Sequence, residues 1–295
     1  MSAIADGFGY VGEPLTFAFM QRGLMAVAIV SVVAAVIGAF VVLKGLAFIG
    51  DGLAHASFGG VAAAFVLGGN IYLGAGIAAV LTSLAITFVS RRARLNFDTA
   101  IGILFVGVFA LGILIVSRQE NYAVDLFSFV FGNVLGVGLD DVVLMGAVGA
   151  LVLLAVAAFY KELLFTAYDP EMAAASGVPV AAVQYGLLAL LGITTVIALK
   201  AVGIVLVVAM LVTPAATAHL LVQRLHHIMA LAAALGLLSC LAGLYISYYA
   251  GVATSAAIVM VATALFSAAF LLSPRRGLLA ALRQPSLPGG INLES

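Results

Sequence analysis

The chain has 295 residues and no formal net charge; 65% of its residues are hydrophobic and only 8% are charged. Soluble domains carry about 25% charged residues, and a water-soluble fold of this length could not hide so much apolar surface. The composition therefore predicts an integral membrane protein. The balanced charge argues against nucleic acid as a partner. The single cysteine, Cys240, excludes a disulfide framework and a zinc finger built on cysteines.

Long apolar stretches predict spanning α-helices, because a transmembrane β-barrel would show strands of about 10 residues with alternating polarity. We expect an all-α polytopic membrane domain over residues 1–284, followed by a disordered cytoplasmic tail over 285–295. Residues 1–21 lack a basic segment, so no removable signal peptide is expected. The nine predicted spans are 23–43, 46–68, 71–90, 100–117, 142–160, 181–199, 203–222, 229–249 and 252–272.

A tenth apolar stretch, Leu126–Val137, is too short to cross a bilayer and is interrupted by Gly132, Asn133 and Gly136. It predicts a re-entrant or interfacial helix. The acidic residues around it are expected on the outer side. A solvated loop explains them more simply than a pore mouth that concentrates cations. These flanking acids are Glu120, Asp125, Asp140 and Asp141.

The distribution of basic residues predicts the orientation. With nine spans, nine of the twelve lysines and arginines fall on one side of the membrane, which the positive-inside rule places in the cytoplasm. The N-terminus then faces out and the C-terminus faces in. The predicted inner set is Lys44, Arg91, Arg92, Arg94, Lys161, Arg224, Arg275, Arg276 and Arg283, against Arg22, Arg118 and Lys200 outside.

One ionisable pair lies well inside a predicted span. Asp51 and His55 are four residues apart, so they share one face of a helix. A carboxylate at this depth is costly and normally faces a polar interior or a pathway, and the pair offers ligands for Mn, Fe or Zn. The alternative is that the two groups simply neutralise each other. Two ligands are too few for tight binding, but a two-fold homodimer would supply four.

Small residues surround this pair and predict close helix packing. They are Gly45, Gly50, Gly52, Ala54, Ala56, Gly59 and Gly60. The other histidines, His219, His226 and His227, favour interfacial or solvated positions over ligation. No lysine follows a glycine and no histidine begins HExxH, so neither a P-loop nor a zinc-protease motif is present. We therefore expect a protein that is not itself an enzyme.

A short helix is predicted in the largest inner loop. Asp169 has the chemistry of an N-cap, Pro170 suits the first helical position and Glu171 the first turn. Gly177 would close the helix, with Pro179 beyond it. Such a capped helix in a cytoplasmic loop suits a docking element, although an amphipathic connector explains it equally well.

Four parts of the sequence together resemble the membrane-spanning permeases of the ABC-3 family, the importers of zinc, manganese or iron. These parts are FMQRGLMA (19–26), FVVLKGLAFIGDGLAHASFGGVA (40–62), LNFDTAIGILF (95–105) with VDLFSFVFGNVLGV (124–137), and YDPEMAAASGVPV (168–180) with LKAVGIVLVVAMLVTPAATAHLL (199–221). The combination of GDxLxHA with TPAATA is specific, and the resemblance covers nearly the whole chain.

The resemblance implies a type II ABC importer in a prokaryotic cytoplasmic membrane. Two permease copies would form the pathway, two ABC ATPases would hydrolyse ATP below them, and an extracytoplasmic metal-binding protein would deliver the cargo. The metal-gating residues would be Asp51 and His55. The coupling helix would comprise Asp169, Pro170, Glu171, Ala173, Ala174 and Gly177. The chain itself would bind no cofactor, and the same ligand types serve Mn, Zn and Fe.

Two other classes of function remain as alternatives. An ion-coupled secondary transporter of a cation also needs a buried acid and a pathway, but the sequence shows no convincing inverted repeat. An intramembrane enzyme is disfavoured, because Asp51 is the only evident buried aspartate and no nucleophile motif is present.

Overall fold

The computed structural model describes residues 13–117, 132 and 134–273, and every element of secondary structure in them is helical. The elements are the 3₁₀ turn η1 (Pro14–Thr16), α2 (Ala18–Leu43), α3 (Ala47–Val66), α4 (Ile71–Ala93), α5 (Phe97–Val116), the 3₁₀ turn η2 (Val134–Gly136), α7 (Leu139–Ala158), α8 (Tyr160–Tyr168), α9 (Pro170–Ala175), α10 (Val180–Leu221), α11 (Leu225–Ala250) and α12 (Thr254–Leu272).

The described residues contain nine helical segments that are long and apolar enough to cross a membrane, so the predicted number of spans is confirmed. Several helices begin earlier than predicted; α2 starts at Ala18 rather than at residue 23. Of the predicted short helix, residues 134–136 form the single turn η2, and 126–131 and 133 lie outside the described residues. The predicted tail, 285–295, also lies outside them.

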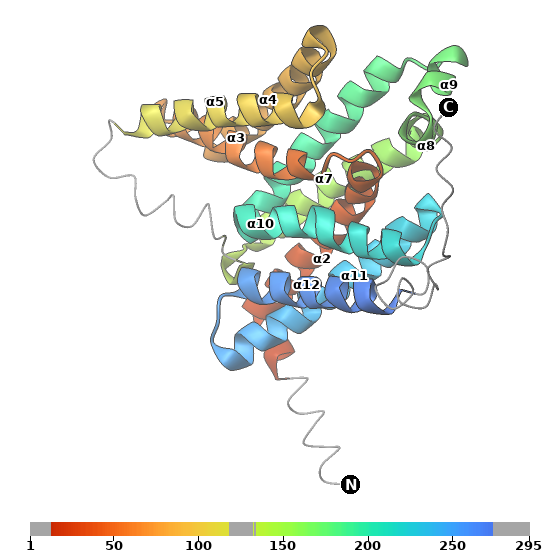
Figure 1. Ribbon diagram of the computed structural model, residues 1–295. Coiled ribbons are helices and arrows are strands. Elements are labelled where there is room, and N and C mark those ends of the chain that lie inside the picture. The colour runs from red at the N-terminus through yellow and green to blue at the C-terminus, as the bar shows by residue number, and fades with distance from the viewer. Residues whose placement is uncertain (1–12, 118–131, 133, 274–295) are drawn as a thin grey trace, which may run out of the picture.

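Helix α10 connects two groups of helices (Figure 1). In one group, α2 packs against α7 and α11, and α11 packs against α12. In the other, α3 packs between α4 and α5. Because α10 contacts α2, α3, α4, α11 and α12, it joins the group around α2 to the group around α3.

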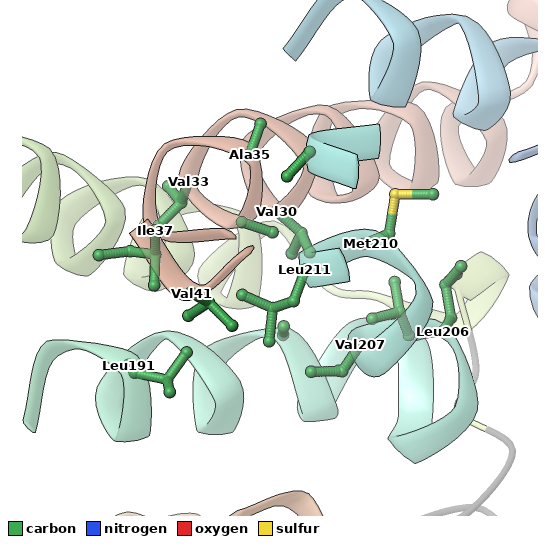
Figure 2. Close-up of a cluster of buried hydrophobic side chains, with 14 of the residues drawn as sticks. Val30, Val33, Ala35, Ile37, Val41, Leu191, Leu206, Val207, Met210 and Leu211 are labelled. Atoms are coloured by element: carbon green, nitrogen blue, oxygen red, sulfur yellow. The ribbon is translucent and has the colours of Figure 1, made fainter. Parts of the chain in front are cut away.

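The core between α2 and α10 is built from aliphatic side chains. Figure 2 shows Val30, Ile37 and Val41 of α2 beside Leu191 and Leu211 of α10, and all five are at most 3% exposed. Lipid chains are as apolar as leucine, so the hydrophobic effect gives little drive for helices to associate within a bilayer. Close van der Waals contact between these side chains must hold the helices together instead.

Helix α10 is broken at Gly203, whose dihedral angles of φ 74° and ψ 173° are open almost only to glycine. The break separates the spanning segments Val180–Leu199 and Val202–Leu221, as the sequence predicted. Figure 1 shows the two halves of α10 running in clearly different directions. Next to the break, the carbonyl of Val202 accepts a hydrogen bond from the hydroxyl of Ser255 in α12 at 3.2 Å.

Helix α3 makes two close approaches at glycines. A Cβ placed on Gly60 would collide with the main chain of α4 at Gly74, and one on Gly74 would collide with Gly60 in return. On the α5 side, a Cβ on Gly112 would come within 2.8 Å of the Cα of Gly59. The prediction that small residues allow close packing around Asp51 and His55 is therefore confirmed at Gly59 and Gly60.

Three of the predicted cytoplasmic turns lie at the same end of the helices. The amine of Lys44, between α2 and α3, donates to the carbonyl of Thr166 in α8 at 3.0 Å. The hydroxyl of Tyr168, at the end of α8, donates to the carbonyl of Gln223, between α10 and α11, at 3.4 Å. This grouping agrees with the predicted topology, while the direction of insertion stays a prediction.

Candidate functional site

Asp51 and His55 lie side by side on α3, with their side chains in contact. The imidazole Nδ1 lies 3.2 Å from the carboxylate Oδ1 of Asp51 and 3.0 Å from the main-chain carbonyl oxygen of the same residue. A carboxylate that holds Nδ1 orients the ring and leaves Nε2 turned away from Asp51, which is how metal-binding imidazoles are commonly fixed. The predicted juxtaposition of the two side chains is therefore present.

The pair lies roughly 12 Å or less from the start of α3, since Asp51 and His55 are its fifth and ninth residues. The side chains of Asp51 and His55 are 41% and 32% exposed, and Phe48, one turn before Asp51, is 69% exposed. Other parts of the α3 surface pack against α4, α5 and α10. The two polar groups thus lie on the outer surface of a single chain, part-way across a span.

Helix α5 forms an aromatic wall beside the pair. The ring of Phe109 meets the imidazole of His55 edge-on at 5.5 Å between centroids, and Phe105 lies 6.0 Å away. Sequence analysis missed these two residues. Their spacing of four on an apolar helix indicates one face, but nothing in the sequence pairs that face with His55. Only the packing of α3 on α5 does so.

The described residues provide only two candidate metal ligands at this site. Across residues 13–117, 132 and 134–273, no group of three or more histidine, cysteine, aspartate or glutamate side chains is close enough to hold a metal ion. Imidazole nitrogen and carboxylate oxygen suit Mn, Fe and Zn alike. The chemistry of the pair therefore fits a divalent transition metal, with ligands beyond these two needed for tight binding.

Helix α9 has the caps that the sequence predicted. The carboxylate of Asp169 accepts a hydrogen bond from the Met172 amide at 2.9 Å, and Pro170 occupies the first helical position. At the other end, the Gly177 amide donates to Ala174 and the Val178 amide to Ala173, which is a Schellman motif. All of α9 except Ala173 is exposed, so the helix presents a free surface beside the neighbouring turns.

Among the predicted outer acids, Asp141 has a local structural role. Its carboxylate accepts a hydrogen bond from the Gly138 amide at 3.2 Å, and Asp140 and Asp141 both lie in the first turn of α7. Negative charge is stabilising there because it faces the positive end of the helix dipole. Glu120 and Asp125 lie outside the described residues.

The remaining three histidines lie close to the turn that joins α10 to α11. His219 is in the last turn of α10, and the rings of His226 and His227 lie 4.2 Å apart near the start of α11. No three-residue metal cluster forms around them in the described part of the chain.

Comparison with known proteins agrees with this architecture. The model of the ABC 3 transport family matches residues 16–273. The chain belongs to this family. The prediction of a membrane-spanning permease is thereby confirmed, and an ion-coupled secondary transporter is not favoured.

Individual relatives cover nearly the full length. The chain is 45% identical over 270 residues to the manganese transport system membrane protein MntC of Halalkalibacterium halodurans, covering 92% of each chain. It is 33% identical to the chelated iron transport system membrane protein YfeD of Yersinia pestis, over 90% of this chain and 89% of that one. A chain of the solved complex of PsaBC from Streptococcus pneumoniae with Fab is 35% identical, with a TM-score of 0.82 and coverages of 93% and 99%.

Proposed function

We propose that this chain is the permease subunit of an ATP-driven importer of a divalent transition metal, and that Asp51 and His55 form its gating site. The observation that carries the proposal is the contact between a carboxylate and an imidazole, both partly exposed, on a membrane-spanning helix. The relatives' names favour manganese, with iron as the nearest competitor. The pair binds the ion as cargo, so the chain has no resident cofactor.

Two copies of the chain are proposed to form the pathway. A carboxylate and an imidazole exposed part-way across a span would face lipid in a single copy, which is costly. A second copy related by a two-fold axis would cover them and would bring two carboxylates and two imidazoles to one place. Four ligands of this type suit a transition metal, whereas the two of one chain do not.

The sequence has no P-loop, so the proposed importer needs separate subunits that hydrolyse ATP. Two ABC ATPases are proposed to dock on α9 of each permease copy, and an extracytoplasmic binding protein is proposed to deliver the ion to the outer end. ATP-driven closure of the ATPases would shift α9 and the turns bonded to its neighbour α8. The pathway would then open to one side of the membrane at a time around the shared site.

A complementation experiment tests the proposal. A strain lacking this protein would receive wild type, Asp51→Ala, His55→Ala or the control Asp98→Ala, which removes an exposed acid from the first turn of α5. Cell-associated metals would be measured by elemental mass spectrometry at matched expression. We expect wild type and Asp98→Ala to restore manganese or iron and both site variants to fail.

Two results would count against the proposal. Full restoration by Asp51→Ala and His55→Ala would show that the pair is structural. Restoration of no metal by the wild type would reject the importer function itself and would favour a transporter of another cation.

A further inference from the structure

The junction between α8 and α9 contains a carbonyl that its own helix cannot satisfy. In an α-helix, each carbonyl accepts a bond from the amide four residues later. The Phe165 carbonyl is satisfied in this way by Asp169 at 3.0 Å. The next carbonyl, that of Thr166, would need the amide of residue 170, which is proline and has no N–H. Thr166 is 2% exposed, so water cannot readily replace that partner.

Lys44 supplies the missing donor from another part of the chain. Its amine lies 3.0 Å from the Thr166 carbonyl, across 122 residues of sequence. Burial lowers the pKa of Lys44 below its usual value, because low-dielectric surroundings disfavour the charged amine. The amine retains hydrogens to donate in either protonation state. When charged, it also complements the negative end of α8.

Lys44 lies in a hydrogen-bonded turn that leads directly into the helix with the Asp51–His55 pair. The Gly45 amide donates to Val42 at 3.1 Å and the Leu46 amide to Val41 at 2.9 Å, which closes α2 with a Schellman motif. Helix α3 begins at Ala47, and Asp51 follows Lys44 by seven residues. A displacement of the α8–α9 junction therefore reaches the start of α3 through one side chain and one locked turn.

We propose that Lys44 is a positioning residue that couples movement of the docking helix α9 to the Asp51–His55 pair through its bond to the Thr166 carbonyl. This inference rests on the proposed function. A purely structural role would instead limit Lys44 to satisfying the carbonyl that Pro170 leaves without a partner. The two roles differ in whether coupling can be lost while the fold and the contact with the ATPases are kept.

The test uses the complete transporter, permease with its ATPases, in liposomes with manganese and the binding protein. Manganese uptake and ATP hydrolysis are measured in parallel for wild type, Lys44→Met and Thr166→Val. The valine variant is a matched control because it changes the side chain and keeps the main-chain carbonyl. We expect Lys44→Met to lower manganese transported per ATP at least about 5-fold, and Thr166→Val to stay within about 2-fold of wild type.

Thermal unfolding and retention of the ATPases, measured on the same Lys44→Met protein, separate coupling from folding. Losing one hydrogen bond is a small change in a protein of this size, so we expect Lys44→Met to unfold within about 4 °C of wild type. We also expect it to retain its ATPases, yet to be uncoupled. A loss of coupling that appears only together with loss of the ATPases and of the folded protein would overturn the proposal, as would a wild-type ratio in Lys44→Met alone. Failure of the wild type to transport any metal would instead reject the proposed function.

Discussion

Helix α9 is defined mainly by residues next to it in the sequence, whereas helix α3 is positioned by helices far from it in the sequence. The caps that begin and end α9 lie within ten residues of sequence: the Asp169 cap, Pro170 at the first position and the Gly177 closure. Helix α3 depends on distant partners, since it packs on α4 and α5 through Gly60 and Gly59. Its polar pair, Asp51 and His55, remains exposed even after that packing.

The difference matters for the two proposed functional elements. The surface of α9 is already formed and exposed, so the proposed docking of the ATPase needs no further folding of this chain. The pair on α3 offers two ligands, and the proposed site takes the other two from a second copy. Substitutions should therefore affect α3 through metal binding and packing, and α9 through local helix stability.

The largest effect is expected for Asp51→Asn. The amide is nearly the same size as the carboxylate but is neutral and a much weaker ligand for a transition metal. We expect metal uptake to fall at least about 10-fold, to background, with the protein still folded. Uptake by cells at matched expression checks this, with Asp98→Asn as the control. Uptake above half of the wild-type level would contradict a ligand role for Asp51.

The packing of α3 predicts the next largest effect. In Gly60→Ala, the new methyl group collides with the main chain of Gly74, and such overpacking costs about 1–3 kcal/mol. The control, Gly102→Ala on α5, places its methyl group where no atom lies within 4 Å, and alanine favours the helix by up to about 1 kcal/mol. Thermal unfolding in detergent should show a clear loss for the first variant. Equal unfolding temperatures for both variants would rule out the close approach.

Loss of the α9 cap should have a smaller and local effect. Asp169→Ala removes the acceptor of the Met172 amide, which costs about 1 kcal/mol of helix stability. Because α9 has only six residues, we expect the affinity for the ATPase to fall about 5-fold, while overall unfolding is unchanged. Asp169→Asn retains a good cap and should bind as wild type. Similar binding by the alanine and asparagine variants would show that the cap does not support docking.

The smallest effect is expected at the outer end of α7. Asp141→Ala removes the bond to the Gly138 amide and a favourable charge in the first turn, at a cost of about 0.3–1 kcal/mol. Metal uptake should remain within about 2-fold of wild type, because the carboxylate stabilises α7 rather than guiding ions. A change of about 2-fold in ion binding would correspond to less than about 0.5 kcal/mol of binding free energy. A large loss of uptake with unchanged unfolding would assign this acid to the pathway.

Much of the fold was predictable because the helices and their ends depend on short stretches of sequence. Apolar stretches of bilayer length predicted the nine spans, and the cap residues Asp169 and Gly177 predicted α9. The spacing of Asp51 and His55 placed them on one face. The phenylalanines beside His55 and the bond from Lys44 to Thr166 were not predictable, because each depends on how separate helices pack. Pro170 was predicted only as the first residue of α9, and its effect on the Thr166 carbonyl emerged from the structure.

The stoichiometry of metal binding tests the central claim, a site shared between two copies, most directly. Wild-type and Asp51→Asn/His55→Gln permeases with different tags would be co-expressed and mixed pairs isolated by successive affinity steps. Bound manganese would then be counted at equilibrium without ATP. The account predicts one ion per two wild-type copies and a loss of affinity of at least about 10-fold in the mixed pair. One ion per copy, with the intact half of a mixed pair binding as tightly as wild type, would contradict it.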